Sequence, residues 1–559
     1  MSTQRAREER FIEECHAHNP WWEGDVERLQ HASAWHPRSD LYAVLNQIEK
    51  ARDASDLFDR VFGWYGQTGI GKSTLLLQLI GTIVDAPSES VGLEIDRREY
   101  EIVDAFDPTD VLYIPIERSL YHLERAEEAI DTLGRVVEYF ETRITTGSDR
   151  LILLDDLGVL ESKPGRLAET IYQMVDEQTY VICTGSVREH VSLETETERL
   201  LTNPVPLLPV KFVDFAQMRL GDEQATRLER LQAGESTAAR DDPDTLTLQD
   251  IRRPLRDDAD PVSFAKTFDR LYFDVLDKDD RQSIAQEARE FLRHGGFPRQ
   301  LTVGHSSTTA GETTNELARS HLELYLFKEL ARAKSIDRPE NLQQLCSLAA
   351  LPGTNEYGYR ELAGRLDVDR RTVRNYIQVL EEGIVLTEST NYALRRHRKT
   401  RLYLRDPRHV VLLSQRHAHD GFESVEGRFP YNPSFERILC RTVVFDHAMR
   451  LAYNTGLEPS IEFAETEHGV IEYILRQNST VLPFALGYEP RAGDATEAVT
   501  TFDPATGNHE SVSGSYDAPV RFVITDAVPR GRQSEGTLQT TVDETTVCYV
   551  PFWAFLLIC

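Results

Sequence analysis

Residues 61–74 read Val61-Phe62-Gly63-Trp64-Tyr65-Gly66-Gln67-Thr68-Gly69-Ile70-Gly71-Lys72-Ser73-Thr74. The first five residues are apolar and predict a short buried strand, and the residues after Ser73 predict a helix. Between them, two glycines, a lysine and a serine have the spacing of a phosphate-binding loop. A strand, a glycine-rich loop and a helix in this order let backbone N–H groups and the helix N-terminus surround phosphate oxygens. The sequence therefore predicts a nucleotide site here.

The residues of this loop have separate expected tasks. Lys72 should reach the β- and γ-phosphates of a nucleotide, and the Ser73 hydroxyl should bind Mg²⁺. We expect the nucleotide to be ATP, held by a continuous run of residues: Gly66, Gln67, Thr68, Gly69, Ile70, Gly71, Lys72, Ser73 and Thr74. At average residue usage this pattern would arise by chance in about 2% of chains of this length, so a fortuitous glycine turn explains it poorly.

A second apolar run ends in two acids. Leu151-Ile152-Leu153-Leu154 predicts a buried central strand, and Asp155-Asp156 follows it directly. Ligands bind at the carboxyl ends of strands in α/β sheets. We therefore expect Asp155 to hold Mg²⁺ through a water molecule and Asp156 to orient or deprotonate the attacking water. A strand that ends in a solvated acidic turn is the alternative.

A third apolar run, Tyr180-Val181-Ile182-Cys183, ends in Thr184-Gly185-Ser186. Polar groups at this position could contact the γ-phosphate or the attacking water, although turn formation explains the same residues. Arg188 and Arg199 follow, and both are candidates for stabilising phosphate charge within this chain or toward a neighbouring one.

From Arg60 onward, short apolar runs alternate with helical stretches, which predicts an α/β fold with a parallel sheet and crossover helices. The expected strands are Val61–Tyr65, Val111–Ile116, Leu151–Leu154 and Tyr180–Thr184. Before them, Trp21 and Trp22 follow Pro20 in a polar helical arm. We expect the two tryptophans to pin this arm to the sheet domain.

The chain has 559 residues and a formal net charge of −30, and its acidic residues are spread over the whole length. We interpret this as the solvated surface of a halophilic protein from a high-salt cytoplasm, with an ordinary acidic protein as the alternative. The charge disfavours a protein whose main task is to coat DNA.

The six cysteines form no CxxC pair and no Cys/His cluster, so we expect neither a disulfide framework nor a zinc site. No apolar stretch reaches the roughly 20 residues that span a bilayer. Met1–Glu14 has no signal-peptide pattern. We therefore expect a cytoplasmic protein that does not contact a membrane.

Several motifs follow one another in a set order along the chain. They are the Asn19–Trp22 arm, the phosphate loop, Val111-Leu112-Tyr113-Ile114, Asp155-Asp156, Cys183-Thr184-Gly185-Ser186, Pro209-Val210-Lys211-Phe212-Val213-Asp214-Phe215, Phe291-Leu292-Arg293-His294-Gly295-Gly296-Phe297-Pro298, a helix-turn-helix, Leu402-Tyr403-Leu404-Arg405-Asp406-Pro407 and Val550-Pro551-Phe552-Trp553. Through them the chain resembles poorly characterised AAA-type P-loop ATPases of archaea and bacteria whose C-terminal half is a domain of unknown function. The resemblance implies an ATPase core, a winged helix and a restriction-endonuclease-like domain. It also implies that a homo-oligomer, either a ring or a dimer, could complete the nucleotide site.

The chain departs from this family at two positions. The family has Asp-Glu where this chain has Asp155-Asp156, and an aspartate is one methylene shorter, which reduces its reach to the attacking water. The family's loop is often rich in arginine where this chain has Gln67-Thr68-Gly69-Ile70. We therefore expect nucleotide binding with slow hydrolysis.

Two helical stretches, Tyr359–Leu366 and Arg370–Leu380, form the helix-turn-helix pattern. The second helix, which usually reads DNA, would project Arg370, Arg371, Arg374 and Asn375. The basic run Ala393–Arg401 could form a wing that touches phosphates. The alternative is a packing module whose arginines pair with the many acids of this chain, and high salt weakens DNA contacts further.

The family's last domain resembles a nuclease core, in which an acid on one strand and a Glu-x-Lys on the next hold a metal and activate water. Here Glu472 supplies the acid, but Ala485 and Gly487 stand at the Glu and Lys positions. Glu489 lies two residues past the lysine position. We therefore expect 430–559 to be a structural domain that cleaves neither DNA nor RNA.

These patterns divide the chain into five expected parts. They are a helical arm (1–55), a P-loop ATPase core (56–220), a charged insertion and helical lid (221–300), a helical and winged-helix domain (301–410) and a degenerate endonuclease-like domain (411–559). Within the third part, 221–262 lack periodicity and indicate an exposed insertion or linker. The leading hypothesis is a slow AAA-type ATPase that acts as a nucleotide-dependent conformational switch on an unknown protein client. A nucleotide-gated DNA-binding regulator and an interaction scaffold are the alternatives.

Overall fold

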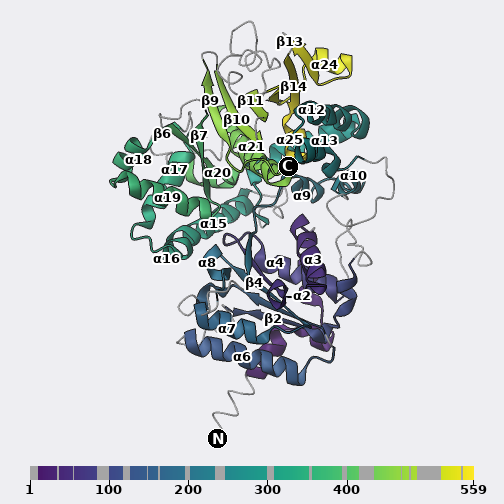
Figure 1. The fold of residues 1–559 in the computed structure, drawn as a ribbon, viewed down its shortest axis with the longest axis vertical. Coiled ribbons are helices and arrows are strands. Elements are labelled where there is room, and N and C mark those ends of the chain that lie inside the picture. The colour runs from purple at the N-terminus through teal and green to yellow at the C-terminus, as the bar shows by residue number, and fades with distance from the viewer. Residues whose placement is uncertain are drawn as a thin grey trace. The chain divides into compact units, whose positions relative to one another are not determined.

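The computed structural model divides into two compact units, which are drawn in Figure 1. Unit 1 comprises Met1–Leu208 and Ser320–Asp337, and unit 2 comprises Pro209–Arg319 and Arg338–Cys559. The structure describes residues 11–33, 37–54, 56–84, 100–116, 126–147, 149–160, 164–194, 202–232, 246–298, 308–351, 356–392, 399–414, 433–466, 469–477, 480–487, 518–542 and 545–559.

Unit 1 is built on a sheet of five parallel strands. They are β1 (Val61–Tyr65), β2 (Val111–Pro115), β3 (Arg150–Asp155), β4 (Thr179–Gly185) and β5 (Asn203–Pro206). Their order is β2-β3-β4-β1-β5, and every neighbouring pair is parallel. The first four strands lie at the predicted apolar runs, so the predicted α/β core with a parallel sheet is confirmed.

Helices cover both faces of this sheet. On one face, Leu112, Ile152 and Val181 share a buried core with α6 (Ala126–Arg143) and α7 (Pro164–Met174). Alternate strand residues such as Leu151 and Ile182 point to the other face and are buried too. There α4 (Lys72–Ile83) packs with α2 (Glu27–Ser33) and α3 (Ser39–Arg52). Burial on both faces explains why these strands read as continuous apolar runs.

The N-terminal arm, which contains the short helix η1 (Pro20–Glu23), covers the β2 edge of the sheet. Indole N–H groups of Trp21 and Trp22 both donate to the Val111 carbonyl, at 3.0 Å and 2.9 Å. The Asn19 side chain accepts from the Tyr113 amide at 2.7 Å and donates to the Tyr113 carbonyl at 3.1 Å. These contacts confirm that the two tryptophans pin the arm to the sheet domain.

Unit 1 also includes Ser320–Asp337, which we call the strap. It contains the end of α15 (Thr308–Leu324), the π-helix η8 (Tyr325–Leu330) and α16 (Ala331–Ala333). Lys334 forms an ion pair with Glu189 of α8 (Arg188–Val191). Tyr325 is fully buried, and its pKa is raised well above the ordinary value, first because burial desolvates the hydroxyl and then because Glu329, Tyr65 and Glu189 are near. The strap is thus anchored on unit 1 although the chain on either side of it belongs to unit 2.

Unit 2 starts with helices that replace the irregular insertion expected at 221–262. They are α9 (Phe212–Gln217), α10 (Asp222–Gln232), α11 (Leu248–Asp258), α12 (Pro261–Asp269), the π-helix η7 (Arg270–Val275) and α13 (Lys278–His294). Among the described residues of 221–262, α10 and α11 bury Leu228, Leu231 and Leu255. For 221–232 and 246–262 that expectation was wrong, because charged residues occupy the solvent faces of these helices and obscure a sparse apolar stripe. The rest of the stretch, 233–245, lies outside the described residues.

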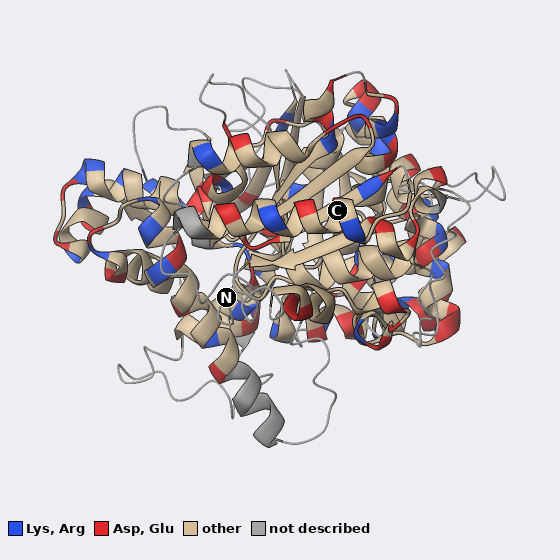
Figure 2. Cartoon of the chain, turned by 90° about the horizontal axis from the view of Figure 1, so that it is seen from below, with Lys and Arg blue, Asp and Glu red and all other residues tan. Residues whose placement is uncertain are grey.

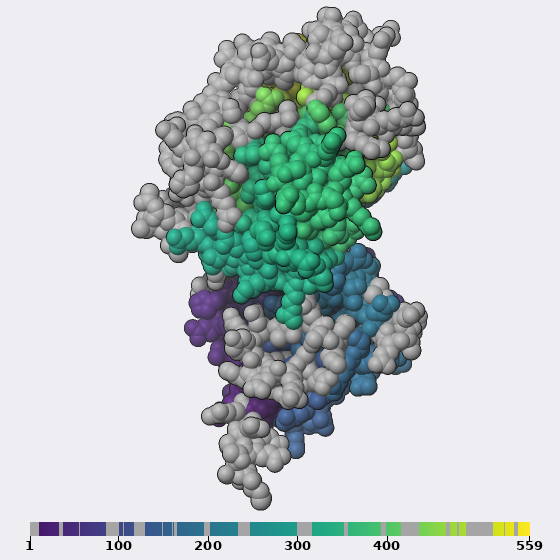
Figure 3. Space-filling view, turned by 90° about the vertical axis from the view of Figure 1, so that its left-hand side faces the viewer, coloured from purple at the N-terminus to yellow at the C-terminus, as the bar shows by residue number. Residues whose placement is uncertain are grey.

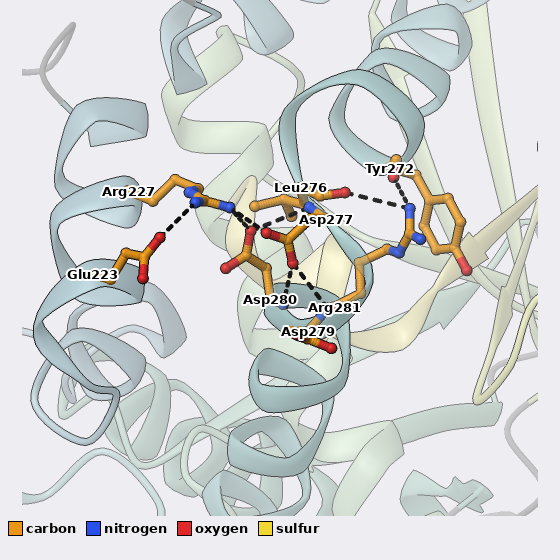
Figure 4. A network of polar contacts seen from close by, with 8 residues as sticks. All are labelled: Glu223, Arg227, Tyr272, Leu276, Asp277, Asp279, Asp280 and Arg281. Atoms are coloured by element: carbon orange, nitrogen blue, oxygen red, sulfur yellow. Dashed lines mark hydrogen bonds and ion pairs between the residues drawn. The ribbon is translucent and has the colours of Figure 1, made fainter.

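Figure 4 shows how arginines neutralise acids between these helices. Arg227 of α10 forms ion pairs with Glu223 of its own helix and with Asp277 and Asp280 at the start of α13. Asp277 is also the N-cap of α13, where its side chain accepts from the Asp279 and Asp280 amides. The pKa of Asp277 is lowered, first by the backbone hydrogen bond from Asp280 and then by Arg227. The network joins two helices and caps one of them.

The helix-turn-helix pattern forms part of a longer element series. It runs α17 (Pro339–Ala349), β6 (Glu356–Gly358), α18 (Tyr359–Leu366), α19 (Arg370–Glu382), β7 (Leu386–Asn391) and β8 (Lys399–Leu404). Strand β8 pairs antiparallel with both β6 and β7. The sequence pattern predicts seven apolar core residues in the helix-turn-helix. Five of them are buried and two, Ala363 and Val368, are half-buried; the buried ones are Leu362, Leu366, Val373, Ile377 and Leu380. This element series is drawn in teal to green in Figure 3.

The chain closes unit 2 with helices around a nine-stranded sheet. The helices are α20 (Pro407–Ser414), α21 (Pro433–Thr455), α24 (Arg530–Glu535) and α25 (Phe552–Leu557), and the strands are β9 (Glu462–Thr466), β10 (Gly469–Gln477), β11 (Thr480–Gly487), β12 (Val520–Thr525), β13 (Gln539–Val542) and β14 (Thr545–Pro551). The sheet order is β13-β14-β12-β11-β10-β9-β7-β8-β6, and a parallel β7–β9 pair makes the sheet continuous with the hairpin after α19. The apolar C-terminal run is buried throughout α25.

Motifs far apart in the sequence meet inside unit 2. The Gly296 amide donates to Asp406 Oδ2 at 2.7 Å, and the Gly296 carbonyl accepts from the Val210 amide at 2.7 Å. The Phe212 amide donates to His447 Nε2 at 3.2 Å. Three of the motifs quoted from the sequence, 209–215, 291–298 and 402–407, therefore meet at Gly296.

The surface charge is mixed on a local scale in the described residues. Figure 2 shows that Lys and Arg positions alternate with Asp and Glu positions along the helices of the chain. No helix among the described residues is both long enough and apolar enough to cross a membrane.

Candidate nucleotide site

The phosphate loop joins the end of β1 to the start of α4, as the sequence predicts. Gly69 and Gly71 have φ angles of 84° and 99°, in the left-handed region that residues with a Cβ rarely adopt. A Cβ on Gly66 would lie 2.6 Å from the Leu207 carbonyl oxygen. The three glycines therefore permit a tight loop that a larger residue would obstruct, at the N-terminus of a 12-residue helix.

Lys72 lies over the beginning of the loop. It is buried, and its ammonium group donates to the carbonyl oxygens of Gly66 and Gln67, at 2.8 Å and 3.4 Å. Ser73, the next residue of α4, is exposed. The lysine cation and the serine hydroxyl thus belong to one helical turn, which is the arrangement that phosphate and metal binding require.

Arg38 of the arm supports the loop from a second side. Its guanidinium donates to the Ile70 carbonyl at 2.8 Å and to the Leu208 carbonyl at 2.6 Å, and it forms an ion pair with Asp40 at 2.8 Å. Sequence reasoning missed this residue, since an arginine in a polar arm carries no local signal for a contact 32 residues away.

Asp155 ends β3, is 5% exposed, and is held by two hydroxyl groups. The Tyr113 hydroxyl donates to Oδ2 at 2.7 Å, and the Thr184 hydroxyl donates to Oδ1 at 2.6 Å. No lysine, arginine or histidine of the described residues forms an ion pair with this carboxylate. Its negative charge is therefore oriented but not neutralised.

Thr184 and its neighbour also connect Asp155 to the phosphate loop at the carboxyl ends of the strands. Its neighbour Gly185 accepts a hydrogen bond from the Gly66 amide at 3.1 Å, at the point where the loop begins. The predicted polar residue at the end of β4 thus binds Asp155 directly. Whether it also meets a phosphate stays a prediction.

Asp156 follows in a strained conformation. Its φ angle is 66°, which is unusual for a residue other than glycine. The Asp156 amide donates to Thr184 Oγ1 at 2.9 Å. Its Oδ1 would lie 3.4 Å from a Cβ placed on Gly158, a position that the buried His190 ring also approaches. Strain of this kind concentrates at functional sites, and here it turns the second acid toward Gly158.

The strap contacts the phosphate loop through the carboxylate of Glu329. Thr68 Oγ1 lies 2.6 Å from each carboxylate oxygen of Glu329. The structure therefore places Glu329, a carboxylate that the sequence did not suggest, beside a loop expected to bind an anion.

The remaining candidates of this unit are less informative. Arg188 is exposed at the start of α8, and Ser186 is buried. Arg199 lies outside the described residues.

In unit 2 the structure separates the basic residues of the helix-turn-helix region into two groups. Arg370, Arg371 and Arg374 are exposed on α19, and no acid of the described residues forms an ion pair with them. Arg401, expected in a phosphate-touching wing, is instead 1% exposed and donates to Glu472 at 2.7 Å. That expectation was wrong for Arg401, because β8 turns this side chain into the sheet. The wing residues 393–398 lie outside the described residues.

Glu472 therefore has a structural partner. The Arg401 guanidinium also lies 3.6 Å from a Glu356 oxygen and 4.1 Å from the centre of the Phe463 ring. Ala485 and Gly487, at the Glu and Lys positions of the expected nuclease motif, both lie on β11. Among the described residues, no group of three or more His, Cys, Asp or Glu side chains could hold a metal ion. Glu489 lies outside the part of the chain that the structure describes.

The parallel sheet, the glycine loop and the acid at the end of β3 define the core of unit 1 as that of a P-loop NTPase. Residues 285–414 match a family model described as a domain of unknown function, DUF8612. No curated protein matches the chain.

Two solved structures are similar in part. Cdc6p from Pyrobaculum aerophilum is 12% identical, with 65% of this chain and 88% of that chain covered and a TM-score of 0.21. A DNA polymerase III gamma subunit-related protein from Thermotoga maritima is 13% identical, with 51% and 91% covered and a TM-score of 0.21. At these TM-scores neither similarity carries an argument about function, which rests on the site geometry.

Proposed function

We propose that this chain binds ATP with Mg²⁺ at the phosphate loop, hydrolyses it slowly, and acts as a nucleotide-dependent conformational switch. The observation that supports this most directly is the meeting of the loop and the acid. Thr184 binds Asp155, and the adjacent Gly185 binds Gly66 at the start of the loop. A cation on α4 and a carboxylate on β3 therefore converge on one sheet edge, where α/β proteins bind ligands.

The residues present fit ATP·Mg²⁺. The glycines permit the backbone turns that let successive N–H groups face a phosphate, and Lys72 supplies a buried positive charge. Ser73 and Asp155 offer the hydroxyl and the uncompensated carboxylate that a hydrated Mg²⁺ would bind. When bound, the metal would neutralise phosphate charge that develops during transfer.

Asp156 is the proposed group that orients or deprotonates the attacking water. Aspartate is one methylene shorter than glutamate, and Asp156 turns toward Gly158. Both features favour slow turnover, which suits a switch more than a motor.

The test of the site is Lys72→Ala. Loss of the buried cation should weaken ATP·Mg²⁺ binding at least about 100-fold, measured by calorimetry in molar KCl on protein whose fold is verified by circular dichroism. Lys50→Ala, which removes an exposed lysine of α3, is the control and should bind normally. Unchanged affinity in Lys72→Ala would remove the basis for this site.

A second function is favoured by the exposed α19 arginines. The helix–strand–helix–helix–strand–strand order and the β6-β8-β7 pairing support a winged helix, and Arg370, Arg371 and Arg374 are free of ion pairs among the described residues. A nucleotide-gated DNA-binding regulator would bind duplex DNA more tightly with ATP than with ADP, and the triple alanine variant would not. Fluorescence anisotropy at several salt concentrations distinguishes this function from the first.

A further inference from the structure

The strap places a carboxylate directly on the phosphate loop. Thr68 has one hydroxyl hydrogen to donate, and both oxygens of Glu329 lie 2.6 Å from its oxygen. The His321 ring packs so closely on Gly69 that a Cβ there would collide with it. The strap therefore covers consecutive residues of the loop, Thr68 and Gly69.

The position of Lys72 indicates which end of a nucleotide would meet this carboxylate. In phosphate loops the lysine reaches the β- and γ-phosphates. Here its ammonium lies at the Gly66 and Gln67 carbonyls, immediately before Thr68. The terminal phosphates would therefore approach the same stretch of the loop that Glu329 contacts.

We propose that Glu329 determines whether the site distinguishes ATP from ADP. A carboxylate oxygen and a phosphate oxygen accept the same hydrogen bond from Thr68, and they repel each other as like charges. A terminal γ-phosphate has to displace Glu329, whereas a diphosphate leaves it in place. Binding of a nucleotide with a γ-phosphate would thereby release the strap from the phosphate loop.

Release of the strap could affect unit 2 because the strap is covalently continuous with it at both ends. The strap is continuous with unit 2 at Arg319 and again at Arg338. It is held on unit 1 by the Lys334–Glu189 ion pair, the buried Tyr325 and the Thr68–Glu329 hydrogen bond. Loss of one of these contacts on ATP binding would loosen a segment whose two ends both enter unit 2.

This inference rests on the proposed function and is tested with the full-length protein and the variant Glu329→Gln. The amide keeps the shape of the side chain and its acceptor oxygen but removes the charge. ATP·Mg²⁺ should bind about tenfold more tightly to the variant, and ADP·Mg²⁺ should change by less than about threefold, as measured by calorimetry. Glu340→Gln removes an exposed carboxylate outside the strap and should change neither affinity.

Hydrogen exchange of the wild-type protein gives a second measurement that needs no variant. Amides of 320–337 should exchange faster with ATP·Mg²⁺ than with ADP·Mg²⁺. Equal effects of Glu329→Gln on both nucleotides, weaker ATP binding, or strap exchange that is the same with both nucleotides would overturn the inference alone. Failure of the wild type to bind either nucleotide would overturn the proposed function itself.

Discussion

Asp155 and Glu472 are both buried carboxylates on strands, at 5% and 7% exposure, yet their partners differ. Asp155 in unit 1 accepts from the neutral hydroxyls of Tyr113 and Thr184. Glu472 in unit 2 accepts from the Arg401 guanidinium. Hydroxyl donors stabilise and orient a negative charge, whereas a guanidinium cancels it.

The difference separates a carboxylate that can still attract a cation from one that cannot. Asp155 keeps its charge at the edge where the phosphate loop begins. Glu472 is already neutralised by Arg401. A buried acid on a sheet strand is therefore poor evidence for a metal site unless its ion-pair partners are known.

The largest expected effect is on the Glu472 side of this comparison. Glu472→Ala removes the 2.7 Å partner of the buried Arg401 guanidinium and leaves it with Glu356 at 3.6 Å. It should cost about 3 kcal/mol of unfolding free energy, measured by urea denaturation. Glu535→Ala breaks a more exposed pair with Arg532 and should cost less than about 1 kcal/mol. Wild-type protein should leave plasmid DNA intact with Mg²⁺ or Mn²⁺. Cleavage that disappears in Glu472→Ala would show that this acid is catalytic after all.

Asp155→Asn should reduce ATP turnover strongly and change stability little, the opposite of the effect expected for Glu472→Ala. We expect Mg²⁺-dependent ATP turnover to fall about 100-fold, because the charge that attracts the metal is gone, while the unfolding free energy changes by less than about 1 kcal/mol. Phosphate release at varied Mg²⁺ concentration measures the first quantity, and urea denaturation measures the second. A large loss of stability with normal turnover would place Asp155 in the same structural class as Glu472.

Tyr113→Phe should also weaken Mg²⁺-dependent ATP turnover, but less than Asp155→Asn does. It removes one of the two hydroxyls that orient Asp155, so the Mg²⁺ concentration for half-maximal turnover should rise by up to about tenfold. ATP binding without Mg²⁺ should stay the same. Tyr139→Phe, whose hydroxyl contacts His16 of the arm instead, is the matched control. Equal behaviour of the two variants would mean that Tyr113 does not position the acid.

Local patterns predicted the strands and the loop well, since a parallel sheet buried on both faces requires continuous apolar runs and a phosphate loop requires its glycines in order. Strand β5 was missed because Pro204 and Pro206 read as loop residues. The partners of the site could not be predicted either. Tyr113 and Asp155 are 42 residues apart, and Thr68 and Glu329 are 261 apart.

Basic residues were harder still to interpret. Arg370 and Arg401 both belong to stretches that suggest DNA contact, but one is exposed and the other is among the largest fully buried side chains. Only tertiary structure distinguishes them. One residue in the quoted motifs could have suggested a partner for Asp155. Tyr113 is the residue with a polar side chain in an otherwise apolar strand, Val111–Pro115.

The two outer strands of the unit 1 sheet restrict how copies of this chain could associate. At one edge, both tryptophans of the arm occupy the Val111 carbonyl. At the other, the Leu207 amide donates to Tyr65 of β1, so the alternate positions Pro204 and Pro206 face outward, where proline has no N–H to offer. Addition of a foreign strand is disfavoured at both edges. A ring or dimer of the core would therefore have to assemble through side-chain surfaces and could not extend the sheet from one copy to the next.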